Sequence, residues 1–262
     1  DVFTPYFGDG SKWGMSIKYA VEKEPLGTGG AIANAAQLLE TKESIVILNG
    51  DVLSSHDLSE QIRQHEANDA DVTLHLTQVE DARAFGCVPT DAQGRVTAFL
   101  EKMENPVTNQ INAGCYVFNP RVISAIPLQT VVSVERETFP QLVSNGAKVY
   151  GYLENAYWLD IGTPKALLKA STDIVLRSGP GLVMPDAVVD STASITGGSC
   201  VGRGSTVGAG TQIHGSIVEA GAVIGRDVVI ENSFVATGAV IDDGAKIGST
   251  FVTKGEILPI PL

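Results

Sequence analysis

Apolar and polar positions alternate along the first 178 residues in segments that suit strands and helices in turn. Strands are predicted at residues 15–22, 44–53, 71–79, 96–102, 111–118 and 148–154. Helical spacing of apolar residues predicts helices at 31–40, 57–69, 121–126 and 132–146, and residues 85–96 are expected to form two strands and a turn. Strands interleaved with helices indicate an α/β domain with a parallel or mixed sheet.

Two of these strands carry more specific expectations. The run Ile45–Leu48 is aliphatic throughout, which favours a central strand covered on both faces. Residues 71–79 alternate strictly between apolar and polar side chains, as in a strand that buries one face. Helix boundaries are marked by Asp57 and by Asn119 before Pro120, both expected at N-termini, and by Gly146 at a C-terminus.

The pattern changes after residues 179–181, where short strands of a different period begin. Aliphatic residues recur every six positions, with two steps of five. They are Val183, Val189, Ile195, Val201, Val207, Ile213, Val218, Ile224, Ile230, Val235, Ile241 and Ile247. This hexapeptide repeat predicts a parallel β-helix of about four three-sided coils, left-handed as in families with this repeat. We therefore expect an α/β domain over residues 1–178 and a β-helix over 182–262.

Composition and charge narrow the functional classes. The chain has 262 residues and a net charge of −12, which disfavours a nucleic-acid surface. Its three cysteines, Cys87, Cys115 and Cys200, are far apart in the sequence, as in a reduced cytoplasmic protein. No apolar run is long enough to span a membrane, so we expect neither a membrane nor a nucleic-acid partner.

Two motifs suggest a phosphate-bearing ligand. The glycine-rich stretch EPLGTGGA (24–31) lies between a predicted strand and a helix, where backbone N–H groups bind anions or where a tight turn needs glycine. Asp51 ends a predicted strand, and Asp160 lies between apolar residues just before a helix that Thr163 is placed to cap. Two carboxylates converging at the carboxyl edge of one sheet could hold Mg²⁺ against a polyphosphate.

Weaker candidates stand at other strand ends. Glu101 and Lys102 could bind sugar hydroxyls and a phosphate, or form an ordinary surface pair. Asn112 offers an amide donor and acceptor, and Gly86 could mark a close backbone approach. The four histidines show no metal spacing, and His56 and His65 are expected in solvent. Cys115 is expected in the core.

Taken together, EPLGTGGA, LNGDVL, FGCV, FLEK, INAGCYVF and WLDIGTP, followed by hexapeptide repeats, resemble the sugar-1-phosphate nucleotidyltransferases. The blocks ARAFGCVPTD, TNQINAGCYVF and SVERETFPQL are similar to the bacterial branch that makes GDP-mannose. The resemblance implies a Rossmann-like catalytic domain with a mixed, mainly parallel sheet. It also implies a Mg²⁺-dependent transfer from GTP to mannose 1-phosphate, with pyrophosphate as the second product.

The family's motifs imply a role for each matched residue. Leu26, Gly27, Thr28 and Gly50 would line the nucleotide site. Asp51 and Asp160 would hold Mg²⁺; Gly86, Glu101 and Asn112 would bind the sugar and Lys102 its phosphate. Asp51, Lys102 and Asp160 are thereby the expected catalytic residues, and a dimer or higher homo-oligomer involving the β-helix is expected.

The family's GGxGTRLxPLT loop has no match in these residues, so we expect them to be part of a longer chain. Alternatives within the class are a glucose-1-phosphate uridylyl- or thymidylyltransferase and a silent regulatory paralogue. Two others are a non-enzymatic scaffold and acyl transfer on the β-helix. Acyl transfer would need His214, the single histidine of the repeats, as its base.

Overall fold

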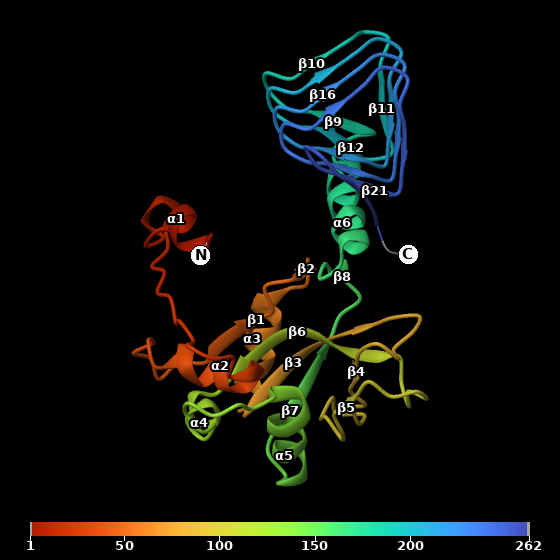
Figure 1. The fold of residues 1–262 in the computed structure, drawn as a ribbon. Helices are drawn as coiled ribbons and strands as arrows, with labels where there is room; N and C mark the ends of the chain where they lie inside the picture. Colours follow the sequence, from red (N-terminus) through yellow and green to blue (C-terminus); the bar gives the residue numbers. More distant parts are fainter. Residues whose placement is uncertain (1, 261–262) are drawn as a thin grey trace. The chain divides into compact units, whose positions relative to one another are not determined.

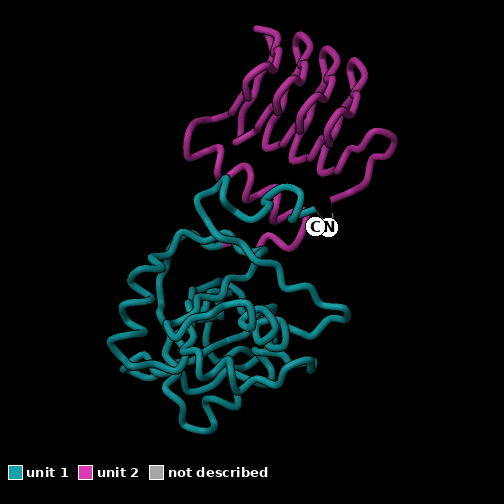
Figure 2. The backbone as a smooth tube through the Cα atoms, turned by 90° about the vertical axis from the view of Figure 1, so that its left-hand side faces the viewer, with its two compact units in different colours: residues 1–158 teal, residues 159–262 magenta. Residues whose placement is uncertain are grey.

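The computed structural model describes residues 2–260 and divides the chain into two compact units, Asp1–Trp158 and Leu159–Leu262 (Figure 2). The sequence predicts the domain boundary at the start of the repeats, after residue 178. The structural division lies earlier in the chain, between residues 158 and 159. The difference arises from helix α6 (Pro164–Leu176), whose Leu168 packs with Phe234 and Ile260 of the second unit. No helix among the described residues is long and apolar enough to cross a membrane.

Unit 1 is built on a six-stranded mixed sheet in the order β5-β4-β6-β3-β7, with β1 also paired to β6 (Figure 1). Its strands are β1 (Ile45–Leu48), β3 (Val72–Gln78), β4 (Gly86–Cys87), β5 (Leu100–Glu101), β6 (Gln110–Phe118) and β7 (Val149–Leu153). The mixed sheet is confirmed. Among the described strands its pairings are mainly antiparallel rather than mainly parallel, since only β3 and β7 run in parallel. The short strands β2 (Val52–Ser54) and β8 (Trp158–Asp160) lie outside it.

Helices cover both faces of this sheet. The helical segments of the unit are α1 (Phe3–Phe7), η1 (Ser11–Trp13), α2 (Gly27–Ala36), α3 (Leu58–Ala67), α4 (Pro120–Ser124), the π-helical turn η2 (Val134–Thr138) and α5 (Phe139–Ser144). One face forms an apolar core in which Leu74 and Tyr116 pack against Ile32 of α2 and Phe139 of α5. The other face lies under α3, whose Gln61 side chain donates a hydrogen bond to the Thr73 carbonyl.

In strand β3 (Val72–Gln78) the alternation of apolar and polar residues does not correspond to an alternation of buried and exposed side chains. Its apolar residues face the core as predicted, but the polar residues between them are buried too: Thr73 and His75 are each 1% exposed. Helix α3 covers them, and its His65 ring lies 3.0 Å from the Thr73 hydroxyl. His65, expected in solvent, is therefore buried, and His56 is half-buried.

Four other segments predicted to form strands differ from the structure. Residues 15–22 form no strand, because no ladder partner pairs with them within residues 2–260, and Val21 is 84% exposed. The segment 96–102 is a strand only at β5. In the described part of the chain, the pairing in segment 85–96 comes from β4 and from two isolated bridges, Thr90–Val96 and Arg95–Tyr150. Among the described strands, β1 pairs only with β6 and is therefore an edge strand rather than a central one; its Leu48 is 62% exposed.

The second unit contains the predicted coils, whose strands stack in three parallel ladders (Figure 1). One side carries β9 (Gly181–Val183), β12 (Ser199–Val201), β15 (Ile217–Val218), β18 (Phe234–Val235) and β21 (Thr250–Val252), closed by antiparallel β22 (Ile257–Pro259). The next carries β10 (Val188–Val189), β13 (Thr206–Val207), β16 (Val223–Ile224) and β19 (Val240–Ile241). The third carries β11 (Ser194–Thr196), β14 (Gln212–His214), β17 (Val229–Glu231) and β20 (Lys246–Gly248).

The ladder registers confirm the repeat and the expected coil number. Val183, Val201, Val218 and Val235 pair in sequence along one ladder, as do Ile195, Ile213, Ile230 and Ile247 along another. The solenoid of about four turns is consistent with the predicted left-handed β-helix. Inside it the aliphatic side chains form one continuous core.

Buried hydroxyls tie one coil to the next. The Ser199 hydroxyl accepts the N–H of Ser216 at 3.0 Å, and the Ser216 hydroxyl accepts that of Ser233 at 3.0 Å. Thr211 does the same for the N–H of Val228. These small residues therefore satisfy backbone groups that a coil interior would otherwise leave without partners.

The predicted helix boundaries are confirmed by hydrogen bonds. The Asp57 carboxylate accepts the Glu60 N–H at 2.9 Å at the start of α3, and Thr163 caps α6 through the Ala166 N–H. The Asn119 side chain caps α4, with Pro120 in the first turn. Gly146 adopts φ +73° just after α5, as the end of that helix requires.

Candidate active site

Three of the expected sugar-binding residues lie together on neighbouring strands. Gly86 of β4 is directly opposite Glu101 of β5, and β4 also pairs with β6, which carries Asn112. A Cβ atom at position 86 would lie 2.7 Å from Oε2 of Glu101. The glycine therefore leaves the space in which the half-buried Glu101 carboxylate lies.

Lys102 and Asn112 are held by local hydrogen bonds. Lys102 has φ +48°, and its backbone N–H donates to the Phe85 carbonyl, so its exposed side chain follows a fixed turn. The Asn112 amide donates to the Tyr116 hydroxyl at 2.8 Å, and its oxygen accepts the Gly114 N–H at 3.2 Å. Burial raises the pKa of Tyr116, which keeps this hydroxyl protonated. Asn112 is thus oriented, with one amide hydrogen and one lone pair left for a ligand.

The glycine-rich loop is packed against the segment before η2. The N–H groups of Gly29 and Gly30 donate to the Val132 carbonyl at 2.8 and 3.4 Å, and Gly27 has φ +68°. A Cβ at Gly27 would lie 2.6 Å from the same carbonyl oxygen. Leu26 precedes the first turn of α2, and its carbonyl accepts the Val132 N–H. Close backbone packing is therefore one use of these glycines.

Thr28 connects this loop to a residue that sequence reasoning did not single out. Its hydroxyl donates to Oε2 of Glu135 at 2.6 Å and accepts the Val134 N–H at 2.9 Å. Glu135 also accepts a bond from the Ser133 hydroxyl. The motif SVERE is visible in the sequence, but nothing in its spacing shows that it anchors a loop about a hundred residues earlier.

Asp51 lies in the turn between β1 and β2. Asn49 positions this turn: its N–H donates to the Gly114 carbonyl at 2.8 Å, and a Cβ at Gly114 would lie 2.8 Å from its side-chain nitrogen. Gly50 is exposed, with no atom within 4 Å of the place where a Cβ would stand. The Asp51 carboxylate is exposed and accepts no hydrogen bond within the described part of the chain. It is available to a ligand.

Asp160 lies in β8 and belongs to the second unit. Its carboxylate is exposed and accepts the Gly162 N–H at 2.9 Å, just before Thr163 caps α6. Within residues 2–260 no group of three or more His, Cys, Asp and Glu side chains is arranged to hold a metal ion. The convergence of Asp51 and Asp160 on one cation stays a prediction.

Two histidines of unit 1 form a stacked pair: His75 lies in β3, and His56 follows β2. The rings of His56 and His75 stack with centroids 3.9 Å apart. His56 is held by Ser54 and Gln61, whereas neither ring nitrogen of His75 has a hydrogen-bond partner. Burial, with a smaller effect of the His56 charge, lowers the pKa of His75 to about 3. Burial also raises the pKa of the Cys115 thiol to about 11, and Cys115 lies in the core as expected.

Since the resemblance assigns Glu101 to the sugar, Gly86→Ala is expected to weaken sugar-phosphate binding. The added methyl group would displace the Glu101 carboxylate and press on the Phe99 ring, 3.0 Å from the new Cβ. We expect KM for the sugar phosphate to rise about tenfold with a smaller effect on the nucleotide, as measured by pyrophosphate release. Gly94→Ala, at a φ of +78° in a turn away from Glu101, is the control for a general glycine effect. An unchanged KM in Gly86→Ala would contradict the role of Glu101.

Comparison with known protein families assigns the chain to a family. Residues 2–176 match the family model described as Nucleotidyl transferase, and the chain belongs to that family. The match ends at the C-terminus of α6 (Pro164–Leu176), close to the boundary near residue 178 that the repeat pattern predicts.

Individual relatives add detail. The chain is 49% identical over 227 residues to mannose-1-phosphate guanylyltransferase of Mycobacterium tuberculosis, covering 82% of this chain and 63% of that protein. It is 34% identical to mannose-1-phosphate guanyltransferase of Yarrowia lipolytica, covering 71% and 54%. The chain thus spans less than two-thirds of the length of these relatives.

Solved structures support the fold. The crystal structure of HddC from Yersinia pseudotuberculosis superposes with a TM-score of 0.56 at 27% identity, covering 65% of this chain and 72% of that one. The same protein complexed with GMP-PN gives a TM-score of 0.55, covering 66% and 75%. A nucleotide analogue is thus bound by a protein that shares much of this fold.

Proposed function

We propose that this chain transfers a guanylyl group from GTP to mannose 1-phosphate, forming GDP-mannose and pyrophosphate. The observation that carries the proposal is the 49% identity to the M. tuberculosis protein named mannose-1-phosphate guanylyltransferase. A phosphate oxygen of mannose 1-phosphate attacks the α-phosphorus of GTP, and pyrophosphate leaves from the opposite side. The expected cytoplasmic location remains a prediction.

The residues of unit 1 act by positioning. Glu101 accepts hydrogen bonds from sugar hydroxyls, and Asn112, already oriented by Tyr116 and Gly114, offers both a donor and an acceptor. Lys102 pairs with the phosphate of the sugar substrate. Holding the two substrates in line accounts for much of such a reaction, because no covalent enzyme intermediate is needed.

The loop at residues 26–28 contributes to the nucleotide site in this proposal. The hydroxyl of Thr28 is already engaged by Glu135 and Val134, so the loop is rigid where it meets the nucleotide. Leu26 is half-buried and offers an apolar surface, and Gly50 leaves space for a close approach. Gly27 allows the backbone of the loop to pack against the Val132 carbonyl. Rigid loops bind with a smaller loss of conformational entropy.

The proposal includes Mg²⁺ held by Asp51 and Asp160. Both carboxylates are exposed hard oxygen donors, and Asp51 has no competing hydrogen bond among the described residues, which fits the ligand preference of this ion. When bound, Mg²⁺ would neutralise charge on the triphosphate.

A substrate panel tests the proposed specificity. We expect pyrophosphate release from GTP with mannose 1-phosphate at least tenfold faster than from UTP or dTTP with glucose 1-phosphate. The assay uses the intact protein with Mg²⁺ present. Turnover with dTTP or UTP but not with GTP would overturn the choice of nucleotide, and no turnover with any pair would favour a regulatory protein.

We also propose that the β-helix forms a homo-oligomer through its second ladder. The outward residues of this ladder stack in register, and Val188, Val223 and Val240 are 66%, 45% and 64% exposed. Thr206 lies in register between Val188 and Val223, so the column is apolar apart from one exposed hydroxyl residue. Such a column can pack against the same column of a second copy, since a two-fold interface is self-complementary.

Light scattering tests this interface. The intact protein is expected as a dimer or higher oligomer, and Val223→Lys is expected to shift it toward the monomer. Gln212→Lys, on the outward side of the third ladder, is the matched control and should leave the oligomer intact. A monomeric wild-type protein would defeat the proposal.

A further inference from the structure

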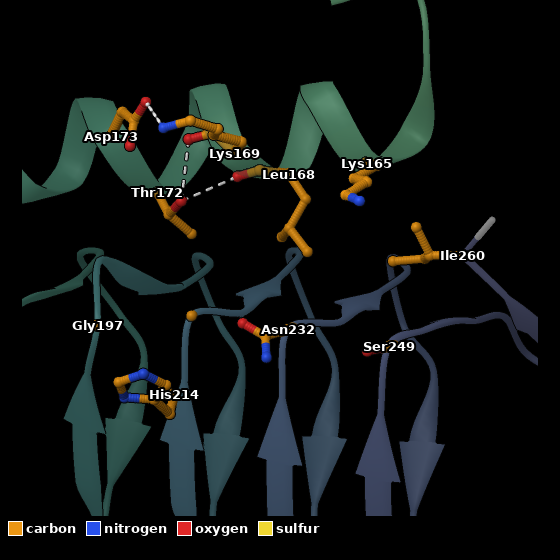
Figure 3. Close-up of a pocket in the computed structure, with 11 residues that line it drawn as sticks. Lys165, Leu168, Lys169, Thr172, Asp173, Gly197, His214, Asn232, Ser249 and Ile260 are labelled. Atoms are coloured by element: carbon orange, nitrogen blue, oxygen red, sulfur yellow. Dashed lines mark hydrogen bonds and ion pairs between the residues drawn. The ribbon is translucent and has the colours of Figure 1, made fainter. Parts of the chain in front are cut away.

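A groove runs between helix α6 and one corner of the coils, entirely within the second unit (Figure 3). It encloses about 420 Å³, a volume in the range of small-molecule sites. Helix α6 contributes Lys165, Leu168 and Lys169 to its wall, and the coils contribute His214, Asn232 and Ser249. Of these residues only His214 has a function suggested by the sequence, as the base of an acyl transfer.

The groove has a closed base because the helix meets the coils at two places. A Cβ atom at Gly198 would lie 2.5 Å from the Thr172 carbonyl oxygen, so the helix backbone rests directly on this corner. Further along, Leu168 packs with Phe234 and Ile260. The space between these contacts is therefore fixed by the packing of the unit and does not depend on a mobile segment.

The corner of the coils supplies polar side chains at positions whose backbone conformation favours glycine. The stacked corner residues Gly197, Gly215, Asn232 and Ser249 all have left-handed backbones, with φ of +65°, +55°, +47° and +51°. The first two coils use glycine here, for which this conformation carries no steric cost. The later coils use Asn232 and Ser249, which face the groove with an amide and a hydroxyl despite that cost.

The charge of the groove is positive in an acidic protein. Lys169 pairs with Asp173 at 2.7 Å, but Lys165 has no ion-pair partner among residues 2–260. Figure 3 shows the Lys165 side chain extending from α6 into the groove. Among the described residues, Asp173 is the one carboxylate in the lining, and the chain as a whole carries a net charge of −12. Lys165 is therefore a cation without compensation beside amide and hydroxyl donors.

We propose that this groove binds a small phosphorylated molecule, a phosphomonoester of a compact polyol, at a site that shares no residue with the proposed active site. Lys165 provides a point charge for the phosphate, and Asn232, Ser249 and the His214 ring provide hydrogen bonds to it or to neighbouring hydroxyls. Leu168 and Ile260 close the site with apolar surface. The volume admits a molecule of about the size of a sugar phosphate.

His214 offers a local readout of occupancy. His214 is the only histidine of the second unit, since His56, His65 and His75 lie in unit 1. The His214 ring is exposed at the groove, with Nδ1 3.1 Å from the Thr196 hydroxyl. Its ring resonance, assigned by His214→Gln, would be followed by NMR during titration of the intact protein. The probes are glucose 6-phosphate, inorganic phosphate and unphosphorylated glucose.

Glucose 6-phosphate and inorganic phosphate are expected to shift the His214 resonance in a saturable way, and glucose is expected to leave it unchanged. Lys165→Gln should raise the glucose 6-phosphate concentration at half-saturation about fivefold or more. Lys246→Gln, which replaces an exposed lysine on β20, should leave that concentration unchanged. Unchanged resonances of the other three histidines would show that the variants are folded. No shift with either phosphate compound, or an equal shift in Lys165→Gln, would overturn the proposal. Neither outcome depends on catalytic turnover.

Discussion

Replacing Asp51 by Asn is expected to lower the turnover number about a thousandfold while leaving the melting temperature within a degree or two of the wild type. The substitution keeps the shape of the side chain but removes a charged oxygen ligand, and the lost charge stabilisation amounts to several kcal/mol. The carboxylate is exposed and has no partner among the described residues, so its loss has little effect on folding. Asp160→Asn is expected to behave alike.

The control for this prediction is Asp242→Asn. Asp242 is exposed in a turn of the coils and has no role in the proposed site, so its replacement should change neither rate nor stability. Rates are measured as pyrophosphate release at saturating GTP and mannose 1-phosphate over a range of Mg²⁺ concentrations. Wild-type rates in both Asp51→Asn and Asp160→Asn would remove the carboxylates from the mechanism.

The second large effect concerns acid stability and His75. In the unfolded chain this histidine titrates near its usual pKa of 6.5, whereas in the folded protein burial lowers the pKa to about 3. Between these values the unfolded state binds a proton that the folded state does not. Stability from this group is therefore present above pH 6.5 and is lost as the pH falls, by about 1.4 kcal/mol per pH unit.

His75→Phe is expected to reduce this dependence. A phenyl ring keeps the stack on His56, and it removes two buried nitrogens that have no hydrogen-bond partner. Between pH 7 and pH 5 the variant should lose about 2 kcal/mol less unfolding free energy than the wild type, measured by urea denaturation. Since the pKa of His65 is also lowered, some acid dependence will remain.

His214→Phe serves as the control, because that ring is exposed. It should follow the wild-type pH dependence throughout. An identical slope in His75→Phe and the wild type would show that His75 is already protonated in the folded protein at pH 5.

The parts of the fold that sequence predicted well are those in which neighbouring residues determine their own environment. In the coils, residues such as Val201 and Ile213 pair with their equivalents one coil away. The period of the repeat therefore predicts which residues pack together. Capping residues such as Asp57 and Thr163 likewise bond within three positions. Both kinds of feature are local and could be read without a structure.

The errors arise where distant elements decide. The polar residues Thr73 and His75 read as a solvent face, and only the position of α3 over β3 buries them. The aliphatic run of β1 reads as a central strand, although within the described residues it pairs on one side only. Whether an apolar strand is an edge strand depends on which partners it has, and the run itself carries no such information.

The candidate site shows the same division. The family's motifs named Gly86 and Glu101, and the structure places them directly opposite each other. The bond from Thr28 to Glu135 joins residues more than a hundred positions apart, so no spacing rule could have indicated it. The roles of Asp51 and Asp160 rest on resemblance together with exposure and hydrogen bonding.

Crystals grown with GTP and Mn²⁺ in place of Mg²⁺ would test the central claim most directly. Mn²⁺ scatters anomalously and takes the same oxygen ligands, so its position can be located without assumptions about the site. The account predicts one anomalous peak at about 2.2 Å from a carboxylate oxygen of Asp51 and from one of Asp160, next to the α-phosphate. A peak bonded to only one of these residues, or to neither, would contradict it.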